Sequence, residues 1–223
     1  GTMPMLRHRL PREEGATESV PTLTAADRSV LGDGSVVAPV VVLPRLPFGS
    51  NLDEFHMLSH ATDVRWATDP RSFADAEIVI LPGSKHVAAD MRWMCDHGLD
   101  VAVRSAASRG VPVIGVCGGA MMLGTHLDDP DGVEGGGSTR MLGLLPLSTT
   151  MTATKWTERV TVDFEHRSGR RRSHDGYEIR HGEVSIDVAA PGAAPGAGGD
   201  RLGGERIVAH SAHGAVAWRR DNV

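Results

Sequence analysis

The chain has 223 residues, a length that accommodates one large domain or two small ones. Hydrophobic residues make up 40% and charged residues 23%, which excludes a wholly disordered chain and leaves enough apolar side chains for a core. A net charge of −5 and only 4% aromatic residues disfavour a general nucleic-acid binder. Two cysteines exclude a disulfide framework, and no apolar run is long enough to span a membrane. We therefore expect a cytoplasmic α/β enzyme domain.

The first 35 residues differ from the remainder of the chain in composition and in hydrophobic pattern. Prolines, glycines and charged residues are mixed there without a sustained apolar period. We predict that residues 1–35 are a linker or the remnant of a neighbouring domain, and that residues 36–223 form the folded domain.

Three β-branched apolar runs predict strands of a buried sheet, at residues 36–43, 76–81 and 111–116. Pro39 must then lie near the start of its strand or at a sheet edge. Between the last two runs, apolar residues recur at helical spacing, and we assign all of them, including Cys95, to the core: Met91, Met94, Cys95, Leu99, Ala102, Val103 and Ala106. Strand, helix and strand in this order predict a βαβ unit and a parallel sheet.

The C-terminal part has a more β-like pattern. Alternation of apolar and polar residues predicts strands at 159–164, 177–186 and 206–210. Residues 166–175, with the basic run Arg170–Arg172, and residues 189–204 are predicted to be loops.

The segment from Gly115 to Gly124 carries the clearest chemical signal. A buried strand ends at Cys117, two glycines follow, and an apolar helix begins, which is the pattern of a nucleophile elbow. The thiol of Cys117 would face the start of the helix, where a negative charge is favoured, and the Gly118 N–H would receive a developing oxyanion. The alternative is that Cys117 is a small buried hydrophobe at a strand end.

A second loop, Leu81–Lys85, also follows a predicted parallel strand. Ligands bind beyond the carboxyl ends of such strands, and Gly83 would let the backbone approach a substrate and offer a second oxyanion donor. The alternative is an ordinary turn between strand and helix.

A thiolate that attacks a carbonyl group needs a proton donor for the leaving group. The chain has 11 histidines. His213, after a late strand, is the best placed of them, and His210 is its rival. The residues alone leave this choice open.

An ordered series of motifs resembles the glutamine amidotransferase domain of cobyric acid synthase over residues 36–214. The matching segments run in the same order: residues 43–55, 81–85, 90–93, 98–100, 115–119, 122–124, 129–134, 143–146, 176–179 and 213–214. The resemblance implies a flavodoxin-like, class I amidotransferase fold, with a central, mostly parallel sheet flanked by helices and a more β-rich C-terminal part.

The resemblance also implies an activity, in which glutamine supplies nitrogen for the ATP-dependent amidation of corrin carboxylates in cobalamin biosynthesis. Cys117 becomes the nucleophile and His213 its partner. Ala215 stands where ordinary class I domains carry a glutamate, and the cobyric acid synthase branch departs at the same position.

The sequence contains no Gly-x-x-x-x-Gly-Lys-Ser/Thr phosphate loop. ATP and Mg²⁺ are therefore expected at a synthetase domain or subunit outside this chain, and residues 1–35 look like the tail of such a domain. The partners expected for this chain are glutamine, the synthetase and its corrin substrate, and neither a cofactor nor a metal is expected in the chain itself.

Three other functions remain open at this stage. The chain resembles, in the same branch, the glutaminase subunit of a complex that amidates a cell-wall lipid precursor. It would also fit a non-catalytic docking module with the same fold, or a cysteine peptidase on a similar sheet.

Overall fold

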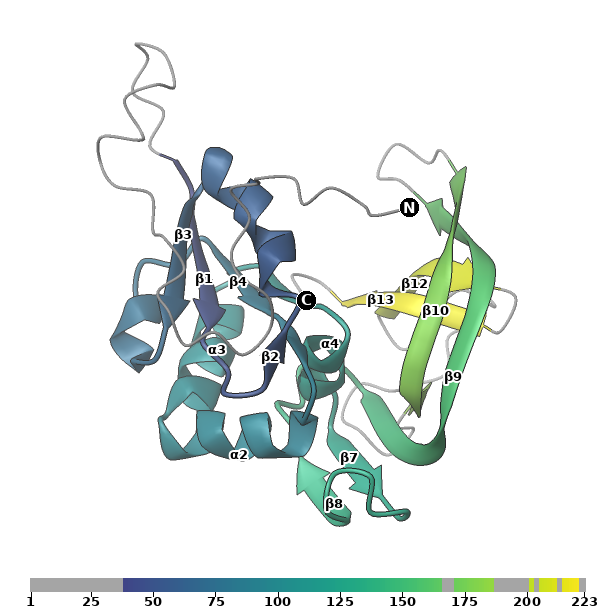
Figure 1. The fold of residues 1–223 in the computed structure, drawn as a ribbon. Coiled ribbons are helices and arrows are strands. Elements are labelled where there is room, and N and C mark those ends of the chain that lie inside the picture. The colour runs from purple at the N-terminus through teal and green to yellow at the C-terminus, as the bar shows by residue number, and fades with distance from the viewer. Residues whose placement is uncertain (1–37, 166–170, 187–200, 203–204, 212–213, 221–223) are drawn as a thin grey trace, which may run out of the picture.

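The computed structural model describes residues 38–165, 171–186, 201–202, 205–211 and 214–220. A four-stranded parallel sheet has the order β3-β1-β4-β6 and consists of β1 (Val40–Pro44), β3 (Asp63–Ala67), β4 (Ile78–Leu81) and β6 (Val113–Gly115). Figure 1 shows β3, β1 and β4 side by side. The three strands predicted from apolar runs are confirmed, with shorter bounds. Pro39 directly precedes β1, where its carbonyl accepts a hydrogen bond from the Asp63 N–H (2.9 Å). The predicted boundary at residue 35 lies outside the described residues.

The edge strand β3 was not predicted. Its residues Asp63, Val64, Arg65 and Trp66 are only partly buried, because β3 has a neighbour on one side alone. Arg65 bonds Asp63 (2.8 Å) and Asp75 on one face of β3, whereas Val64 and Trp66 on the other face pack against buried apolar residues.

The single helix predicted between β4 and β6 is two helices, α2 (Val87–Asp96) and α3 (Leu99–Ser108). Gly98 separates them with φ of 70°, a left-handed conformation that glycine adopts readily. The break changes which residues face the core, and the assignment of Cys95 to the core was wrong, because Cys95 is exposed. Met94 fills the core position beside it.

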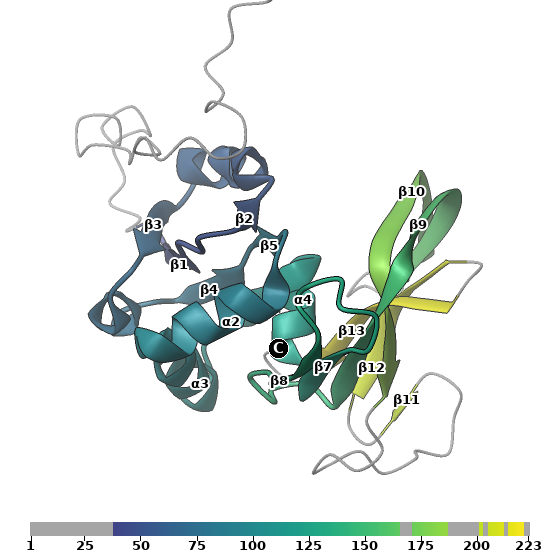
Figure 2. The ribbon, with the colours of Figure 1, turned by 60° about the horizontal axis from the view of Figure 1, so that its bottom comes forward.

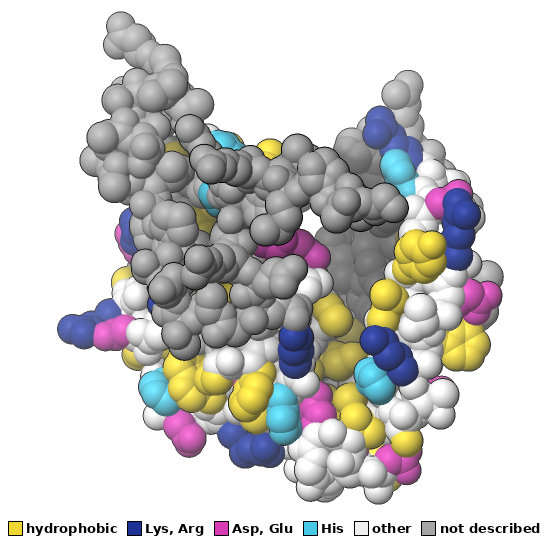
Figure 3. Space-filling model, viewed as in Figure 1, with side chains coloured by type: hydrophobic (Ala, Val, Ile, Leu, Met, Phe, Trp, Pro, Cys, Tyr) yellow, Lys and Arg dark blue, Asp and Glu magenta, His cyan; other side chains and the backbone are white. Residues whose placement is uncertain are grey.

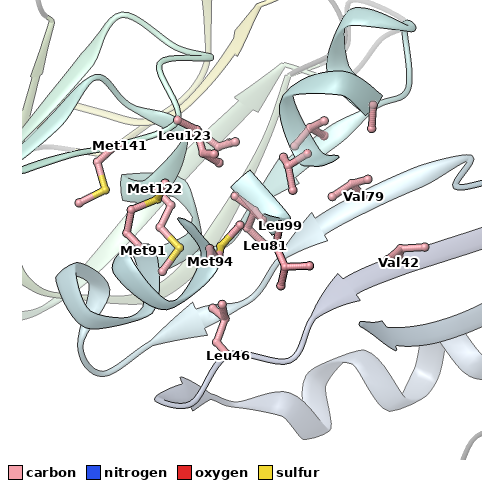
Figure 4. Close-up of a cluster of buried hydrophobic side chains, with 14 of the residues drawn as sticks. Val42, Leu46, Val79, Leu81, Met91, Met94, Leu99, Met122, Leu123 and Met141 are labelled. Atoms are coloured by element: carbon pink, nitrogen blue, oxygen red, sulfur yellow. The ribbon is translucent and has the colours of Figure 1, made fainter. Parts of the chain in front are cut away.

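Both faces of the parallel sheet are covered. On one face Val42, Val79 and Leu81 pack against α2 and α3, where Met91, Met94 and Leu99 lie among them (Figure 4). On the other face a second cluster, Val41, Leu43, Phe55 and Ile80, brings in the 3-10 helix η1 (Leu52–His60). A shorter 3-10 helix, η2 (Pro70–Phe73), packs against α3. Figure 2 shows the sheet between these layers. Neighbouring residues such as Val41 and Val42 belong to different clusters because successive side chains of a strand point to opposite faces of the sheet.

The rest of the chain is β-rich, as predicted, and follows the short helix α4 (Gly118–Leu123). Its seven-stranded sheet consists of β7 (His126–Asp129), β8 (Gly137–Arg140), β9 (Leu147–Glu165), β10 (Arg171–Ile186), β11 (Arg201–Leu202), β12 (Glu205–Ser211) and β13 (Gly214–Arg220). β7 is parallel to β9, whereas the other pairings are antiparallel.

The loop predicted at residues 166–175 is partly wrong, because residues 171–175 begin β10 and pair with β9. Cross-strand hydrogen bonds of Ser173 to Asp163 and of Thr161 to Asp175 hold this polar part of the hairpin, so it lacks the apolar alternation that predicts a strand. Residues 166–170 lie outside the described residues. Residues 189–200 and 203–204 of the second predicted loop, 189–204, also lie outside them, and the prediction is wrong for residues 201–202, which form β11.

Hydrophobic, basic and acidic side chains are interspersed over the β9–β10 hairpin in Figure 3. Tyr177 and Ile179 on β10 are 71% and 54% exposed. Over the part of the chain that the structure describes, no helix has the length and apolar character needed to cross a membrane.

The first turn of α4 lies in close backbone contact with the end of β4. A Cβ atom built on Gly119 would lie 2.1 Å from the Leu81 carbonyl oxygen, and one built on Gly115 would lie 2.7 Å from the Ala120 backbone N. The obstacles are backbone atoms, so no side-chain movement can relieve them. This contact fixes the position of α4 against the sheet.

We predict that Gly119→Ala lowers the free energy of unfolding by about 3 kcal/mol, because overpacking against backbone forces the helix away from β4. Urea denaturation of both proteins measures the change. Gly176→Ala is the matched control, since a Cβ there meets nothing within 4 Å, and we expect a change within about 0.5 kcal/mol. Equal stability of the Gly119→Ala variant and the wild type would contradict the prediction.

Candidate active site

Three loops meet at the carboxyl edge of the parallel sheet, where open α/β sheets bind ligands. They follow β1, β4 and β6, which are neighbours in the sheet. The first two loops carry the short strands β2 (Gly49–Ser50) and β5 (Gly83–Ser84), which pair antiparallel to each other. The third carries Cys117. The prediction that the Cys117 and Leu81–Lys85 loops share one sheet edge is confirmed.

Cys117 has the strained backbone of a nucleophile elbow. Its φ of 51° and ψ of −115° lie in a region that residues with a side chain rarely adopt. Its carbonyl accepts hydrogen bonds from the N–H groups of Ala120 (2.9 Å) and Met121 (3.3 Å) at the start of α4. Cys117 is exposed. The alternative of a small buried hydrophobe is therefore wrong.

Gly83, Gly118 and Cys117 lie together, as the sequence predicted. A Cβ atom built on Gly83 would lie 3.9 Å from the Cβ of Cys117. A Cβ on Gly118 would lie 2.9 Å from the Ser84 backbone N and 3.0 Å from the Ser84 Cβ. The elbow therefore packs directly on the β5 backbone, and only a glycine at position 118 permits that approach.

Asp90, in the first part of α2, joins two of the three loops. Its side chain is completely buried. One oxygen, Oδ1, accepts the Phe48 N–H (3.0 Å), and the other, Oδ2, accepts the Ser84 hydroxyl (2.6 Å). Burial raises the pKa of Asp90 above its ordinary value, against the effect of these two hydrogen bonds.

Glu134 and His86 cap the N-terminus of α2. The Glu134 carboxylate accepts the Ala88 N–H (2.8 Å), and the His86 Nδ1 accepts the Ala89 N–H (3.3 Å). The two side chains also approach each other, with His86 Nδ1 3.3 Å from Glu134 Oε2. The His86 ring lies against the exposed Phe48 ring, with centroids 5.3 Å apart. The helix that carries Asp90 is thus tied to the loop after β7.

That loop is held by a second buried carboxylate, Asp129. Its Oδ1 accepts the Val133 N–H (2.8 Å), and its Oδ2 accepts the N–H groups of Glu134 (2.7 Å) and Gly136 (2.8 Å). Burial disfavours the charge, but the backbone hydrogen bonds outweigh it and hold the pKa of Asp129 below its ordinary value. Asp129 therefore fixes the backbone position from which Glu134 reaches α2.

The histidine predicted to act with Cys117 cannot be placed beside it, since the structure does not describe that residue. His213 lies outside the described residues. The backbone of His210 lies in β12, opposite Asp163 of β9 and Ala215 of β13. The roles of His213 in proton transfer and of Gly83 and Gly118 as oxyanion donors remain predictions.

Sequence reasoning missed Asp90, Asp129 and Glu134 as contributors to the site. All three lie in segments that carry the resemblance, 90–93 and 129–134, but nothing in their spacing showed which backbone N–H groups they accept. Among the described residues, His, Cys, Asp and Glu side chains do not gather into a group that would hold a metal ion.

The sequence is similar to known proteins over almost all of its length. The family described as the CobB/CobQ-like glutamine amidotransferase domain matches residues 40–222. Cobyric acid synthase of Deinococcus radiodurans is 41% identical over 88% of this chain and 40% of that protein. Cobyric acid synthases of Polaromonas sp. and Paracidovorax citrulli are 35% and 38% identical over all of this chain and 45% and 43% of their own lengths.

The chain thus spans less than half the length of these curated relatives. Among solved structures, a glutamine amidotransferase superposes with a TM-score of 0.54 at 19% identity, covering 81% of this chain and 84% of that chain. PurLQS from Thermotoga maritima gives a TM-score of 0.55 at 14% identity, covering 80% and 76%. These two structures support the fold, which is the α/β amidotransferase fold that the sequence predicted.

We predict that Asp129→Asn destabilises the protein by about 1–3 kcal/mol at pH 7, because an amide cannot accept all three backbone N–H groups. The pKa of Asp129 is lowered on folding, so its stabilisation is complete above the ordinary Asp pKa of about 3.9 and is lost as pH falls through the folded value. Urea denaturation from pH 7 to pH 3 should show a constant difference between wild type and variant that shrinks below about pH 4.

Asp131→Asn is the matched control in the same loop. Asp131 is exposed and accepts only the Ala153 N–H (3.1 Å) with one oxygen, which an amide oxygen can still do. We expect this variant to stay within about 0.5 kcal/mol of the wild type at every pH. A difference for Asp129→Asn that does not change with pH would show that its charge contributes nothing.

Proposed function

Because the chain belongs to the family of CobB/CobQ-like glutamine amidotransferase domains, we propose that it hydrolyses glutamine at Cys117 and supplies the ammonia for ATP-dependent amidation of corrin carboxylates in cobalamin biosynthesis. The observation that carries the proposal is the elbow. An exposed thiol with a strained backbone lies directly after β6 at the carboxyl edge of the parallel sheet, with Gly83 and Gly118 close to it. A cysteine with a purely structural role has no need of that conformation.

The first half of the reaction is an acyl transfer to sulfur. The Cys117 thiolate attacks the side-chain amide carbon of glutamine and forms a C–S bond, while the carbonyl π electrons move to oxygen. The N–H groups of Gly118 and Gly83 are proposed to bind this oxyanion. When the tetrahedral intermediate collapses, the C–N bond breaks and ammonia leaves with a proton from His213.

The second half is hydrolysis of the glutamyl thioester. His213, neutral after giving up its proton, takes a proton from water, and the resulting hydroxide attacks the thioester carbon. A second oxyanion forms in the same position and is bound by the same N–H groups. Its collapse breaks the C–S bond and releases glutamate, and His213 returns its proton to the thiolate or the solvent.

The acceptor assignment depends on the relatives. They are cobyric acid synthases, and this chain spans 40–45% of the lengths of the three compared above. We propose that a synthetase domain or subunit provides the remainder, binds ATP and Mg²⁺, and activates each corrin carboxylate that the ammonia then attacks. Both parts are expected to work in the cytoplasm.

We predict that Cys117→Ala lowers glutaminase activity on the order of 10⁶-fold, the loss typical of removing a catalytic nucleophile. Glutamate release from glutamine is measured with the synthetase partner present. Cys95→Ala is the matched control and should keep wild-type activity, since partial desolvation of the Cys95 thiol and the neighbouring Asp100 carboxylate raise its pKa and leave it a poor nucleophile. His213→Ala is expected to lose about 10²–10⁴-fold.

The same assay decides between the two histidines. A large loss in His210→Ala with none in His213→Ala would transfer the proton-transfer role to His210. No glutamate from the wild type, together with no labelling of Cys117 by a chloroketone analogue of glutamine, would instead favour the non-catalytic docking module.

The acceptor has a separate test. With the synthetase part, ATP, Mg²⁺ and glutamine, we expect new amide groups on a corrin diamide, detected by mass spectrometry as a loss of about 1 Da for each carboxylate converted to an amide. ¹⁵N from amide-labelled glutamine should appear in the product, and Cys117→Ala should form product only when free ammonia is added. Amidation of a lipid-linked cell-wall precursor but not of the corrin would overturn the assignment and leave the glutaminase reaction intact.

A further inference from the structure

Asp90 is a buried carboxylate that the proposed reaction does not use. We propose that Asp90 is a positioning residue for catalysis, which holds Ser84 and the neighbouring Gly83 against the Cys117 elbow so that the two oxyanion donors converge. The inference rests on the proposed function, since it concerns the oxyanion site of the glutaminase reaction.

The carboxylate joins two chain segments that belong to different strands. Oδ1 accepts the Phe48 N–H (3.0 Å) from the loop after β1, and Oδ2 accepts the Ser84 hydroxyl (2.6 Å) in β5. A backbone hydrogen bond from the Lys85 N–H to the Phe48 carbonyl (2.9 Å) and the β2–β5 pairing join the same segments. Asp90 thus adds two side-chain hydrogen bonds to a connection that these backbone contacts also make.

Both oxygens of Asp90 accept hydrogen bonds in this arrangement. The Ser84 Oγ accepts the His86 N–H (3.0 Å), so the hydroxyl proton is available for Asp90. The Phe48 N–H can only donate. A carboxylate satisfies both donors, whereas an amide in the same place accepts one and presents its NH₂ group to the other. An amide at residue 90 can therefore keep a bond to Ser84 only by donating to its Oγ, which turns the hydroxyl proton away and reverses the direction of the bond.

The position of Ser84 is transmitted directly to the elbow. A Cβ on Gly118 would touch the Ser84 backbone N at 2.9 Å and its Cβ at 3.0 Å, and a Cβ on Gly83 would lie 3.9 Å from the Cys117 Cβ. A shift of β5 thus moves Gly83 relative to Cys117 and Gly118. Displacement of a catalytic group by about 1 Å costs on the order of 100-fold in rate.

A purely structural role makes a different prediction. If Asp90 only stabilises the fold, its removal lowers stability, but the folded fraction keeps its turnover number. If Asp90 positions the oxyanion donors, removal lowers kcat in fully folded protein and changes KM little, because the oxyanion forms only after glutamine has bound.

The test compares Asp90→Asn, Ser84→Ala and the double variant as 223-residue chains with the synthetase partner, at a temperature where circular dichroism shows each to be folded. We expect kcat for glutamate release to fall about 100-fold in Asp90→Asn with KM within about threefold. Ser84→Ala should lower kcat about tenfold or more, and the double variant should lose no more than Asp90→Asn alone, because both changes break one link.

Two controls separate positioning from general damage. Asp100→Asn removes another buried carboxylate, one that bonds Arg104 (2.6 Å) in α3, and should lose stability without losing kcat. Alkylation of Cys117 by iodoacetamide, which forms no oxyanion, should stay within about twofold of the wild-type rate in Asp90→Asn.

The outcomes are distinct. Wild-type kcat in folded Asp90→Asn overturns the inference, as does a double variant whose losses multiply. A kcat loss in Asp90→Asn matched by an equal loss of iodoacetamide reactivity also overturns it, because the elbow itself would then be disturbed. Wild-type protein without glutaminase activity overturns the proposed function instead.

Discussion

The contact between the first turn of α4 and the end of β4 is the constraint on which the rest of the site depends. Gly119 lies so close to the Leu81 carbonyl that no side chain fits, and a Cβ on Gly118 would lie 2.9 Å from the Ser84 backbone N. Cys117 must then turn through a left-handed conformation to enter α4 from β6, which leaves its thiol exposed at the sheet edge. Strain at one residue is tolerated because backbone packing on both sides of it determines the path of the chain.

Two buried carboxylates hold the loops around this elbow. The loops cannot be fixed by hydrophobic packing, because their backbone N–H groups need acceptors when they are removed from water. Asp90 accepts a backbone N–H and a hydroxyl, and Asp129 accepts three backbone N–H groups, among them that of Glu134. Glu134 in turn caps the helix that carries Asp90. The loops after β1, β4 and β7 are therefore connected through α2, and the charges act as acceptors rather than as acids.

The parallel sheet and the elbow could be predicted from sequence because both leave local patterns. β-branched runs mark β1, β4 and β6, and Cys117 followed by two glycines marks the turn. The break at Gly98 could not be predicted, since the apolar residues on either side keep helical spacing, and Cys95 was wrongly assigned to the core for that reason. The start of β10 was wrongly predicted to be a loop, because polar pairs such as Ser173 and Asp163 hold it to β9 and it has no apolar alternation. Asp90 was missed because its donors, Phe48 and Ser84, come from distant segments.

The arrangement also explains why the proposed oxyanion site is divided between the start of α4 and the short strand β5. An elbow supplies one N–H at the start of its own helix, that of Gly118, and a second must come from a chain that can approach the thiol closely. β5 meets this requirement because it lies beside the elbow, where a Cβ on Gly83 would be 3.9 Å from the Cys117 Cβ. However, β5 has two residues and, within the part of the chain that the structure describes, pairs only with the equally short β2, so ladder hydrogen bonds alone leave it weakly restrained. The Asp90 carboxylate, buried beneath it, adds the restraint that a longer strand would have supplied, and this makes the precision of the site depend on α2.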